Sequence, residues 1–402
     1  MARLPGIDAP EQVVCHVDMD CFYAACERLR DPTLDGEPLV VGMGYETGET
    51  HGAVATASYE AREYGVESAM SITEALERLP RRGEGDTDMD GSNGVYRSVD
   101  MDFYKAVSED VRSVLSRAAE TVRNVSIDEA YLDLGDLEWS EVTAFGRSLK
   151  REIEADAGVV ASVGIAPDMT TAKLASDADK PDGLVVVEPD DVRSFLAPIP
   201  IDELHGVGPV TASNLRELGF ETAGDIAAAE ESVLVDAFGK RGRDLYAQAR
   251  GEDDRTVEPK GDPKSVSSES AFVEAIEDAA RKRERIEALA ADASERATAK
   301  NALYRTIGIK VVEPPFDVHT RSQSLSGPVD DPELVERTAV ELLTEFEADR
   351  VRKLGVRLSN LSFDDREQAT IAEWGTDGEN GREGDPRWTR TSGRQARLSR
   401  FE

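Results

Sequence analysis

Three acidic residues of this sequence stand in apolar segments, where a carboxylate is costly unless a cation or polar partner accompanies it. Asp18 ends the apolar run 13–17, and Asp128 and Glu129 stand side by side in a second apolar stretch. Close carboxylates on rigid elements are the ligands that a pair of Mg²⁺ ions needs for phosphoryl transfer. A lone Asp at a strand end is usually just solvated, but three such acids in one folding unit favour a metal site.

The segments around these acids alternate between strand and helix patterns. Two of them meet in a predicted tight hairpin around Asp128 and Glu129. The order strand, helix, hairpin, helix, strand predicts a ferredoxin-like βαββαβ unit. The other expected elements are strands at residues 13–17, 38–42, 52–56 and 159–165, and helices at 22–29, 59–64, 102–119 and 140–155.

The rest of the chain changes character after residue 187. Short helices with Gly punctuation are expected over 188–254, and residues 265–365 again predict strand, long helix near 277–300, two strands, helix and strand. A polar acidic loop is expected over 81–94. Its Asp86-x-Asp88-x-Asp90-Gly91 resembles the start of a calcium loop, but the twelfth position is Arg97 instead of Glu, so no calcium site is expected.

The formal net charge of −34 is extreme for 402 residues. Phosphate binding needs Lys and Arg, so this charge argues against a nucleic-acid partner in dilute buffer. In about 1 M salt the Debye length falls to roughly 3 Å, and acidic surfaces no longer repel DNA at range. Two interpretations follow: the chain does not touch nucleic acid, or it works in very high salt. The composition resembles that of proteins from salt-accumulating archaea.

Cysteine and histidine usage argues against other classes of site. The three cysteines, Cys15, Cys21 and Cys26, are odd in number and lack C-x-x-C spacing, so neither a disulfide framework nor a cysteine metal site is expected. The four histidines are scattered, which argues against zinc. Without an apolar run of about 18 residues or a signal-peptide pattern, a soluble, cytoplasmic protein with no membrane partner is expected.

Four ordered segments carry a family resemblance: residues 18–24, 53–62, 126–131 and 180–183, which read DMDCFYA, AVATASYEAR, SIDEAY and KPDG. They resemble motifs of the Y-family translesion DNA polymerases, most of all the DNA polymerase IV branch, and the similarity runs from about residue 13 to 363. The resemblance implies an α+β multidomain fold like a right hand, with a ferredoxin-like βαββαβ palm. Its implied domains are a palm at 1–21 and 100–187, fingers at 22–99, a thumb at 188–254, a linker at 255–264, a βαββαβ little finger at 265–365 and a flexible tail at 366–402.

The resemblance also implies roles around the metals. Asp18, Asp128 and Glu129 would hold two Mg²⁺ ions with the Met19 carbonyl as a further ligand, and Glu129 would lie nearest the primer 3′-hydroxyl. Asp20 belongs to the motif, but a structural hydrogen bond is its expected role. The positions implied to bind the incoming nucleotide are Cys21, Phe22, Tyr23, Thr56, Tyr59, Arg62 and Lys180.

Several of these nucleotide contacts also have a physical reason. Tyr59 and Arg62 are three apart and share one helix face, and Arg suits bidentate phosphate contact. Tyr23 matches the steric gate, a ring under the sugar that leaves no room for a 2′-hydroxyl. Residues 52–56 are small, and the resemblance implies that they cover the templating pair. The resemblance further implies a roomy site with low fidelity and tolerance of damaged templates.

DNA contacts are expected outside the palm. Gly206-Val207-Gly208 is typical of a helix-hairpin-helix turn, whose backbone amides can bind phosphate without side-chain charge. In the little finger, the family resemblance implies phosphate contacts from strand residues such as Arg352 and Lys353. The tail ends in a peptide that resembles the sliding-clamp motif of polymerases, with Glu402 in place of the usual second aromatic; its key residues are Gln395, Leu398 and Phe401.

The resulting prediction is a monomeric, template-directed DNA polymerase of low fidelity for translesion synthesis and repair. Its predicted partners are primer–template DNA, deoxynucleoside triphosphates and a sliding clamp, and no proofreading exonuclease is expected. One alternative is a DNA-binding factor of the same fold that has lost catalysis, which the intact acidic trio disfavours. Another is a palm-fold nucleotide cyclase, which the helix-hairpin-helix pattern disfavours.

Overall fold

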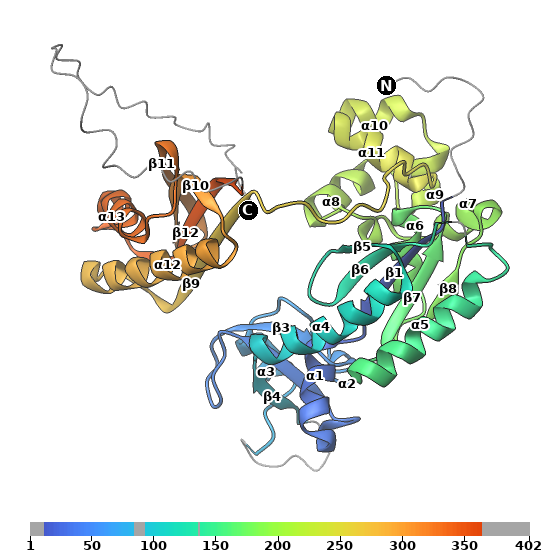
Figure 1. Cartoon of the computed structure of the whole chain (residues 1–402), viewed down its shortest axis with the longest axis horizontal. Coiled ribbons are helices and arrows are strands. Elements are labelled where there is room, and N and C mark those ends of the chain that lie inside the picture. The colour runs from blue at the N-terminus through green and yellow to red at the C-terminus, as the bar shows by residue number, and fades with distance from the viewer. Residues whose placement is uncertain (1–11, 84–92, 136, 364–402) are drawn as a thin grey trace. The chain divides into compact units, whose positions relative to one another are not determined.

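The computed structural model describes residues 12–83, 93–135 and 137–363. It divides into two compact units, Met1–Gly261 and Asp262–Glu402, each of which is described by itself (Figure 1). The calcium-like loop at residues 86–91 and the clamp-like peptide at 395–402 lie outside the described residues.

A five-stranded sheet with the order β5-β6-β1-β7-β8 forms the centre of the first unit (Figure 1). β1 is antiparallel to both of its neighbours, and β8 is parallel to β7. The first four strands in chain order, β1, β5, β6 and β7, have the pairing of a ferredoxin-like sheet, which confirms the predicted βαββαβ unit. The strands are β1 (Val14–Met19), β5 (Thr121–Asn124), β6 (Glu129–Asp133), β7 (Ala161–Ala166) and β8 (Leu184–Val186).

The two faces of this sheet are covered by different helices. Side chains alternate along a strand, so Cys15 and Val17 of β1 pack in one core with α4 (Met101–Ala118) and α5 (Val142–Ala157). Val14 instead packs in a second core with α6 (Met169–Asp177) on the other face. His16 and Asp18 have the same parity as Val14 and therefore point to the α6 face.

A smaller subdomain of the first unit contains the sheet β3-β2-β4. Its elements are α1 (Phe22–Arg30), η1 (Pro32–Leu34), β2 (Leu39–Met43), β3 (Ala53–Ala57), α2 (Tyr59–Arg62), α3 (Ile72–Arg78) and β4 (Val95–Ser98). Ser58 caps α2 by accepting from the amide of Ala61, and Gly65, with a φ of 78°, follows this turn. The expected strand at 52–56 and the helical turn after it are therefore confirmed within a residue or two.

Short helices complete the first unit after β8. They are η2 (Pro189–Asp191), α7 (Val192–Leu196), η3 (Ile201–Glu203), α8 (Pro209–Glu217), α9 (Ala223–Ala228), α10 (Glu231–Phe238) and α11 (Lys240–Ala249). They share the α6 core. The first residues of the segment expected as a linker, 255–264, pack against the first unit. Val257 is buried, and Arg123 of β5 donates to the Glu258 carbonyl oxygen at 3.2 Å.

The second unit has the predicted order of elements but not the sheet order of the first unit. Its elements are β9 (Ser265–Ile276), α12 (Ala279–Ala299), β10 (Leu303–Glu313), β11 (Asp317–Val329), α13 (Pro332–Leu343), η4 (Thr344–Phe346) and β12 (Val351–Ser362). The sheet order is β11-β10-β12-β9, and each neighbouring pair is antiparallel. α12 and α13 pack together over one face (Figure 1), which leaves the opposite face without a covering helix among the described residues.

One boundary differs from the sequence prediction. The hairpin between β5 and β6 was expected to turn around Asp128 and Glu129, but the turn spans residues 125–128 and Glu129 is the first residue of β6. The amides of Val125 and Ser126 close it by donating to the Glu129 carbonyl oxygen. None of the helices in the described residues is both long and apolar enough for a membrane crossing.

Candidate active site

The strand register brings the three acids to one place. Asp18 of β1 lies directly opposite Glu129 of β6, so their side chains share the α6 face of the sheet. The Met19 amide donates to the Asp128 carbonyl oxygen at 2.9 Å, which extends the pairing into the hairpin turn. Residues more than one hundred positions apart in the chain are therefore held on adjacent strands by backbone hydrogen bonds.

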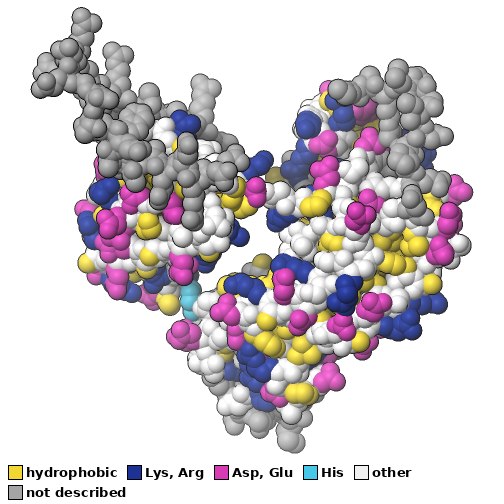
Figure 2. Space-filling view, viewed as in Figure 1, with side chains coloured by type: hydrophobic (Ala, Val, Ile, Leu, Met, Phe, Trp, Pro, Cys, Tyr) yellow, Lys and Arg dark blue, Asp and Glu magenta, His cyan; other side chains and the backbone are white. Residues whose placement is uncertain are grey.

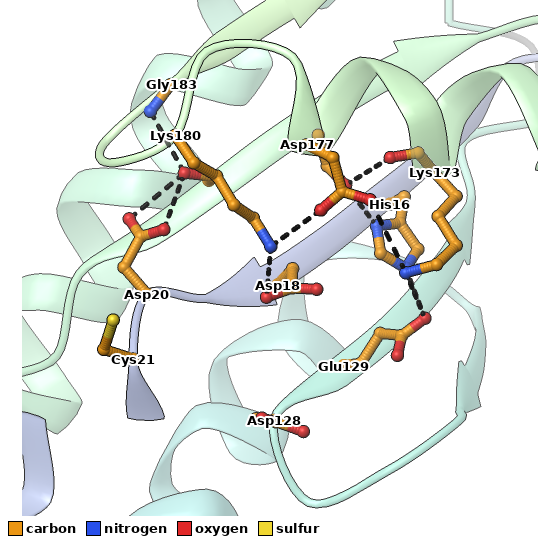
Figure 3. Close-up of polar contacts among 12 residues, drawn as sticks. His16, Asp18, Asp20, Cys21, Asp128, Glu129, Lys173, Asp177, Lys180 and Gly183 are labelled. Atoms are coloured by element: carbon orange, nitrogen blue, oxygen red, sulfur yellow. Dashed lines mark hydrogen bonds and ion pairs between the residues drawn. The ribbon is translucent and has the colours of Figure 1, made fainter. Parts of the chain in front are cut away.

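Both strand-borne carboxylates face cationic side chains from α6 and the loop after it (Figure 3). The Lys180 ammonium lies 2.7 Å from Asp18 Oδ1 and 2.8 Å from Asp177 Oδ1. Glu129 Oε1 lies 3.1 Å from the Lys173 ammonium. In the hairpin turn, the Ser126 hydroxyl donates to Asp128 Oδ1 at 2.5 Å.

The environments of Asp18 and Glu129 shift their pKa values in opposite directions. A hydrogen bond from His16 and the nearby Lys173 ammonium together lower the pKa of Glu129 to about 2, against the effect of burial. Burial raises the pKa of Asp18, although Lys180 opposes this effect. Glu129 is therefore ionised at neutral pH, whereas the burial of Asp18 acts against its charged form and Lys180 favours that form.

The strand register brings three possible ligands of a divalent cation together, but their side chains are not turned toward a common point. Hard oxygen donors from Asp18, Asp128 and Glu129 are the ligand type that Mg²⁺ prefers. Within residues 12–83, 93–135 and 137–363, no group of three or more His, Cys, Asp or Glu side chains is arranged to hold a metal ion. Lysine ammonium groups instead compensate two of the three carboxylates, so binding of metal ions here would require those lysines to move.

Asp20 is a buried hydrogen-bond acceptor that ties three segments together. It accepts from the Ser162 hydroxyl at 2.9 Å, the Asp182 amide at 2.8 Å and the Tyr59 hydroxyl at 3.0 Å. The residue is only 7% exposed, so these donors satisfy the hydrogen-bonding capacity of a buried carboxyl group. The expectation of a structural hydrogen bond for Asp20 is confirmed.

Four of the predicted nucleotide contacts gather around the end of β3. Cys21 has a φ of 45°, precedes α1, and donates through its Sγ to the Ala57 carbonyl oxygen at 3.4 Å. The Arg62 Nε donates to the same oxygen at 3.1 Å, and the guanidinium lies 4.8 Å from the centre of the Tyr59 ring. Thr56 is the neighbour of Ala57 within β3.

Tyr23, the predicted steric gate, is the second residue of α1. Its ring is half-buried and stacks on Tyr104 of α4, with 4.7 Å between the ring centres and 23° between the planes. Burial raises the pKa of Tyr23, and the negative charge of Asp128 adds to this effect. The ring thus rests on α4, while the adjacent Phe22 is buried in the core between α4, α5 and the central sheet.

The predicted helix-hairpin-helix turn lies at the start of α8. Gly206 has a φ of 81°, a conformation that L side chains rarely adopt, and Gly208 caps a helix that begins with Pro209. A Cβ on Gly208 would meet no heavy atom within 4 Å. No neighbouring atom therefore crowds Gly208 at this helix N-terminus, where backbone amides without intrahelical partners suit an anion such as phosphate.

The helix-free face of the second unit carries basic side chains, and we call it the open face. Lys310 alternates with the core residues Ile309 and Val311, and its register partner Gly355 pairs in turn with Glu269. Glu269 Oε2 lies 3.2 Å from the Lys310 ammonium and 2.5 Å from that of Lys353. A bulge in β10 next to Arg305 interrupts the alternation, and this side chain is exposed.

Two basic residues of the second unit are not displayed as free cations on the open face. Arg321 lies against helix-side groups, because it pairs with Glu345 at 2.5 Å and covers the Phe346 ring at 5.1 Å. Arg352, one of the predicted DNA contacts, is half-buried, and its Nη1 atom has no hydrogen-bond partner in the described structure.

Three residues that lie behind the acids were not among the predicted site residues. His16 and Lys173 contact Glu129, and Asp177 pairs with Lys180, yet none of the three belongs to a segment that carried the family resemblance. Period-two alternation places His16 on the same strand face as Asp18 and would have identified it. The reach of Lys173 depends on how α6 packs on the sheet, and no local pattern predicts that packing.

Comparison with known proteins agrees with this architecture. The family profiles described as impB/mucB/samB family, its HHH motif and its C-terminal domain match residues 17–177, 189–220 and 263–371. The DNA polymerase IV of Halobacterium salinarum is 58% identical over 377 residues, covering 93% of this chain and 91% of that protein. The DNA polymerase IV of Methanoculleus marisnigri is 40% identical, covering 90% of this chain and 98% of that protein.

Solved structures with a similar fold are also DNA polymerases. A Y-family DNA polymerase chimera, Dbh-Dpo4(243-245)-Dbh, superposes with a TM-score of 0.77 and 29% identity, covering 88% of this chain and 100% of that chain. An insertion ternary complex of Dbh DNA polymerase gives 0.62 at 27% identity with the same coverage. The fold and these relatives thus define a DNA-directed DNA polymerase with palm, thumb and little-finger domains. Within that class, the chain belongs to the Y family, in the branch named DNA polymerase IV.

Proposed function

We propose that this polymerase extends a primer on a template strand with low fidelity, in translesion synthesis and DNA repair, and that Asp18, Asp128 and Glu129 carry its catalysis. The observation that supports these roles most strongly is the register of the central sheet. It sets Asp18 opposite Glu129 and bonds the Met19 amide to the Asp128 carbonyl oxygen. Rigid neighbouring strands keep the acids in a constant relation, which the positioning of reacting phosphates requires.

Two Mg²⁺ ions would be held by these three carboxylates and the Met19 carbonyl, and they would supply activation of the primer hydroxyl and stabilisation of the leaving phosphate. The low pKa of Glu129 keeps this ligand ionised at neutral pH. Lys180, which now contacts Asp18 at 2.7 Å, would turn to the triphosphate once that carboxylate is otherwise neutralised. Its partner Asp177 keeps the ammonium within the site.

The nucleotide would lie between the palm and the small β3-β2-β4 subdomain. Arg62 and Tyr59 would meet its phosphates from α2, and the amides of Cys21 and Phe22 would meet them from the start of α1. The left-handed backbone of Cys21 turns the chain from β1 into α1 at this point. The Tyr23 ring, braced by Tyr104, would exclude a ribose 2′-hydroxyl, and Thr56 would face the templating pair from β3.

DNA would be held by two kinds of contact. The open backbone at Gly206 and Gly208 would bind a phosphate through amides alone, which suits a chain with a net charge of −34. The open face of the second unit would contribute Lys353, and Arg352 would act from the same strand. On the side drawn in Figure 2, acidic side chains stand among Lys and Arg side chains on both units. Such a mixed surface supports DNA binding at high salt, where charge repulsion is screened.

Primer extension with purified protein tests the proposal. The parent protein should extend a labelled primer, with Mg²⁺ required and an optimum at high KCl, whereas Glu129→Ala should lose the activity. Glu120→Ala is the matched control, because this exposed acid precedes β5 outside the site. Equal extension by the Glu129→Ala and parent proteins would refute the catalytic assignment, and activity confined to dilute buffer would refute the high-salt interpretation.

A further inference from the structure

A buried histidine lies directly behind the catalytic carboxylate of Glu129. His16 of β1 is 0% exposed and lies in register between Tyr131 of β6 and Gly164 of β7. Its ring is 4.5 Å from the centre of the Tyr131 ring, at 60° to it. A buried polar ring needs hydrogen-bond partners, and the partners of His16 connect the core to the active site.

Both ring nitrogens of His16 are engaged. Nε2 lies 2.9 Å from Glu129 Oε1, and Nδ1 lies 2.7 Å from the Ser176 hydroxyl oxygen (Figure 3 shows the ring beside Glu129). An ionised carboxylate only accepts, so Nε2 carries the proton of that bond and donates it to Glu129. The Ser176 hydroxyl donates to the Lys173 carbonyl oxygen at 2.7 Å, so its oxygen is held in place beside Nδ1.

The fold holds Ser176 against this ring through a close approach of α6 to β7. A Cβ on Gly164 would lie 2.1 Å from the Ala172 carbonyl oxygen and 2.3 Å from the Ser176 amide nitrogen. Only glycine permits that approach. The Asp168 side chain caps α6 by accepting from the Thr171 amide at 2.8 Å, which fixes where the helix begins. Ser176 is 1% exposed, so its position is set by packing.

The contacts to Glu129 are asymmetric. His16 and Lys173 both reach Oε1, at 2.9 and 3.1 Å. Lys173 is a flexible side chain with 28% exposure, whereas His16 is clamped on both sides. A donor fixed on Oε1 sets the rotation of the carboxylate plane and leaves Oε2 as the oxygen for a metal ion or the primer hydroxyl.

We propose that His16 is a positioning residue, which holds the Glu129 carboxylate in its catalytic orientation through the hydrogen bond from Nε2. Ser176 fixes the ring in turn. The inference rests on the proposed role of Glu129 in nucleotide joining. Groups that orient metal ligands in this way typically change metal affinity or activity by about 10- to 100-fold when they are removed.

Two substitutions of His16 separate donation from packing. His16→Leu keeps an apolar side chain of similar bulk without a donor, and His16→Gln restores an amide N–H that can reach the position of Nε2. His319→Leu, in the second unit, is the matched loss of an imidazole. Each full-length variant is compared with the parent by thermal melting, by kcat and KM for a deoxynucleotide, and by Mn²⁺ binding in electron paramagnetic resonance.

His16→Leu should melt as a folded protein, lose about 10- to 100-fold in kcat with an unchanged KM, and bind Mn²⁺ more weakly by a similar factor. His16→Gln should recover most of both losses, and His319→Leu should match the parent. Parental kcat and Mn²⁺ affinity in a folded His16→Leu protein would overturn the proposal, as would a His16→Gln protein no better than His16→Leu.

If His16→Leu does not fold, the Ser176→Ala variant tests the positioning role instead. This substitution removes the contact that fixes the His16 ring but keeps the ring and its Nε2 donor. A reduced kcat with unchanged KM supports the positioning role, and parental kcat and Mn²⁺ affinity overturn it. The proposed function fails in a different way. A parent protein that extends no primer, yet binds Mn²⁺ in a manner that depends on His16, would refute polymerase activity and leave the positioning role intact.

Discussion

The glutamate on the open face should control how steeply DNA binding depends on salt. Glu269 lies across Gly355, where a Cβ would come within 2.7 Å of its Cγ, and it contacts the ammonium groups of Lys310 and Lys353. The carboxylate therefore occupies two cations that DNA phosphates would otherwise neutralise. Glu269→Gln removes that competitor and keeps nearly the same shape.

The magnitude follows from counterion release. Each phosphate that a cation neutralises steepens the plot of log K against log salt by about 0.9 for duplex DNA. Freeing both lysines should steepen the plot by up to about 1.8, so a tenfold rise in salt would weaken the variant about 60-fold more than the parent. The variant should bind more tightly in dilute salt and lose this advantage as the salt concentration rises.

The assay is fluorescence anisotropy with primer–template DNA across a series of KCl concentrations. Glu284→Gln is the control, because it removes the same charge from an exposed position on α12, which covers the opposite face of the sheet. A general charge effect would change both variants alike. Equal slopes for Glu269→Gln, Glu284→Gln and the parent would refute the competition between Glu269 and DNA.

Three further predictions concern other parts of the chain. Tyr23→Ala should raise ribonucleotide incorporation, because the ring stacked on Tyr104 would no longer fill the space beside the sugar; unchanged sugar selection in primer extension would refute the gate. Deletion of residues 395–402 should abolish stimulation by a sliding clamp and spare basal extension, and equal stimulation of the truncated protein would exclude a clamp role for this peptide. Lys282, 1% exposed, donates to the carbonyl oxygens of Phe346, Glu347 and Asp349 at 2.6–3.0 Å. Lys282→Met should therefore lower the free energy of unfolding of the second unit by about 3–5 kcal/mol, and an unchanged denaturant midpoint would contradict this.

Local sequence patterns predicted most of the first unit because its key side chains follow simple periodicity. The alternation along β1 assigns Asp18 to one face and Val17 to the other, and the apolar stripe of α4 fixes its extent within a residue. The hairpin was placed correctly, but its turn was expected too far along the chain. Turn geometry depends on the hydrogen bonds of Val125 and Ser126 to the Glu129 carbonyl, and these are not visible in residue types.

Local sequence patterns did not predict the strand order of the second unit or the side-chain contacts between distant parts of the chain. The second unit repeats the element order of the first, yet its last strand, β12, lies between β10 and β9, whereas in the first unit the first strand, β1, lies between β6 and β7. The order of elements along the chain does not distinguish these two arrangements. The Glu269 bridge requires Gly355 on the neighbouring strand, and the His16 contact requires Gly164 beneath α6. Each of these features joins residues at least 80 positions apart through register or helix packing.

The most direct test of the carboxylate site is anomalous diffraction from crystals of the protein with primer–template DNA, a non-reactive deoxynucleotide analogue and Mn²⁺. The register of β1 and β6 predicts two Mn²⁺ peaks, with Asp18, Asp128 and Glu129 among their ligands and Lys180 turned to the triphosphate. Manganese elsewhere in the molecule, with Lys180 and Lys173 still on Asp18 and Glu129, would contradict the account.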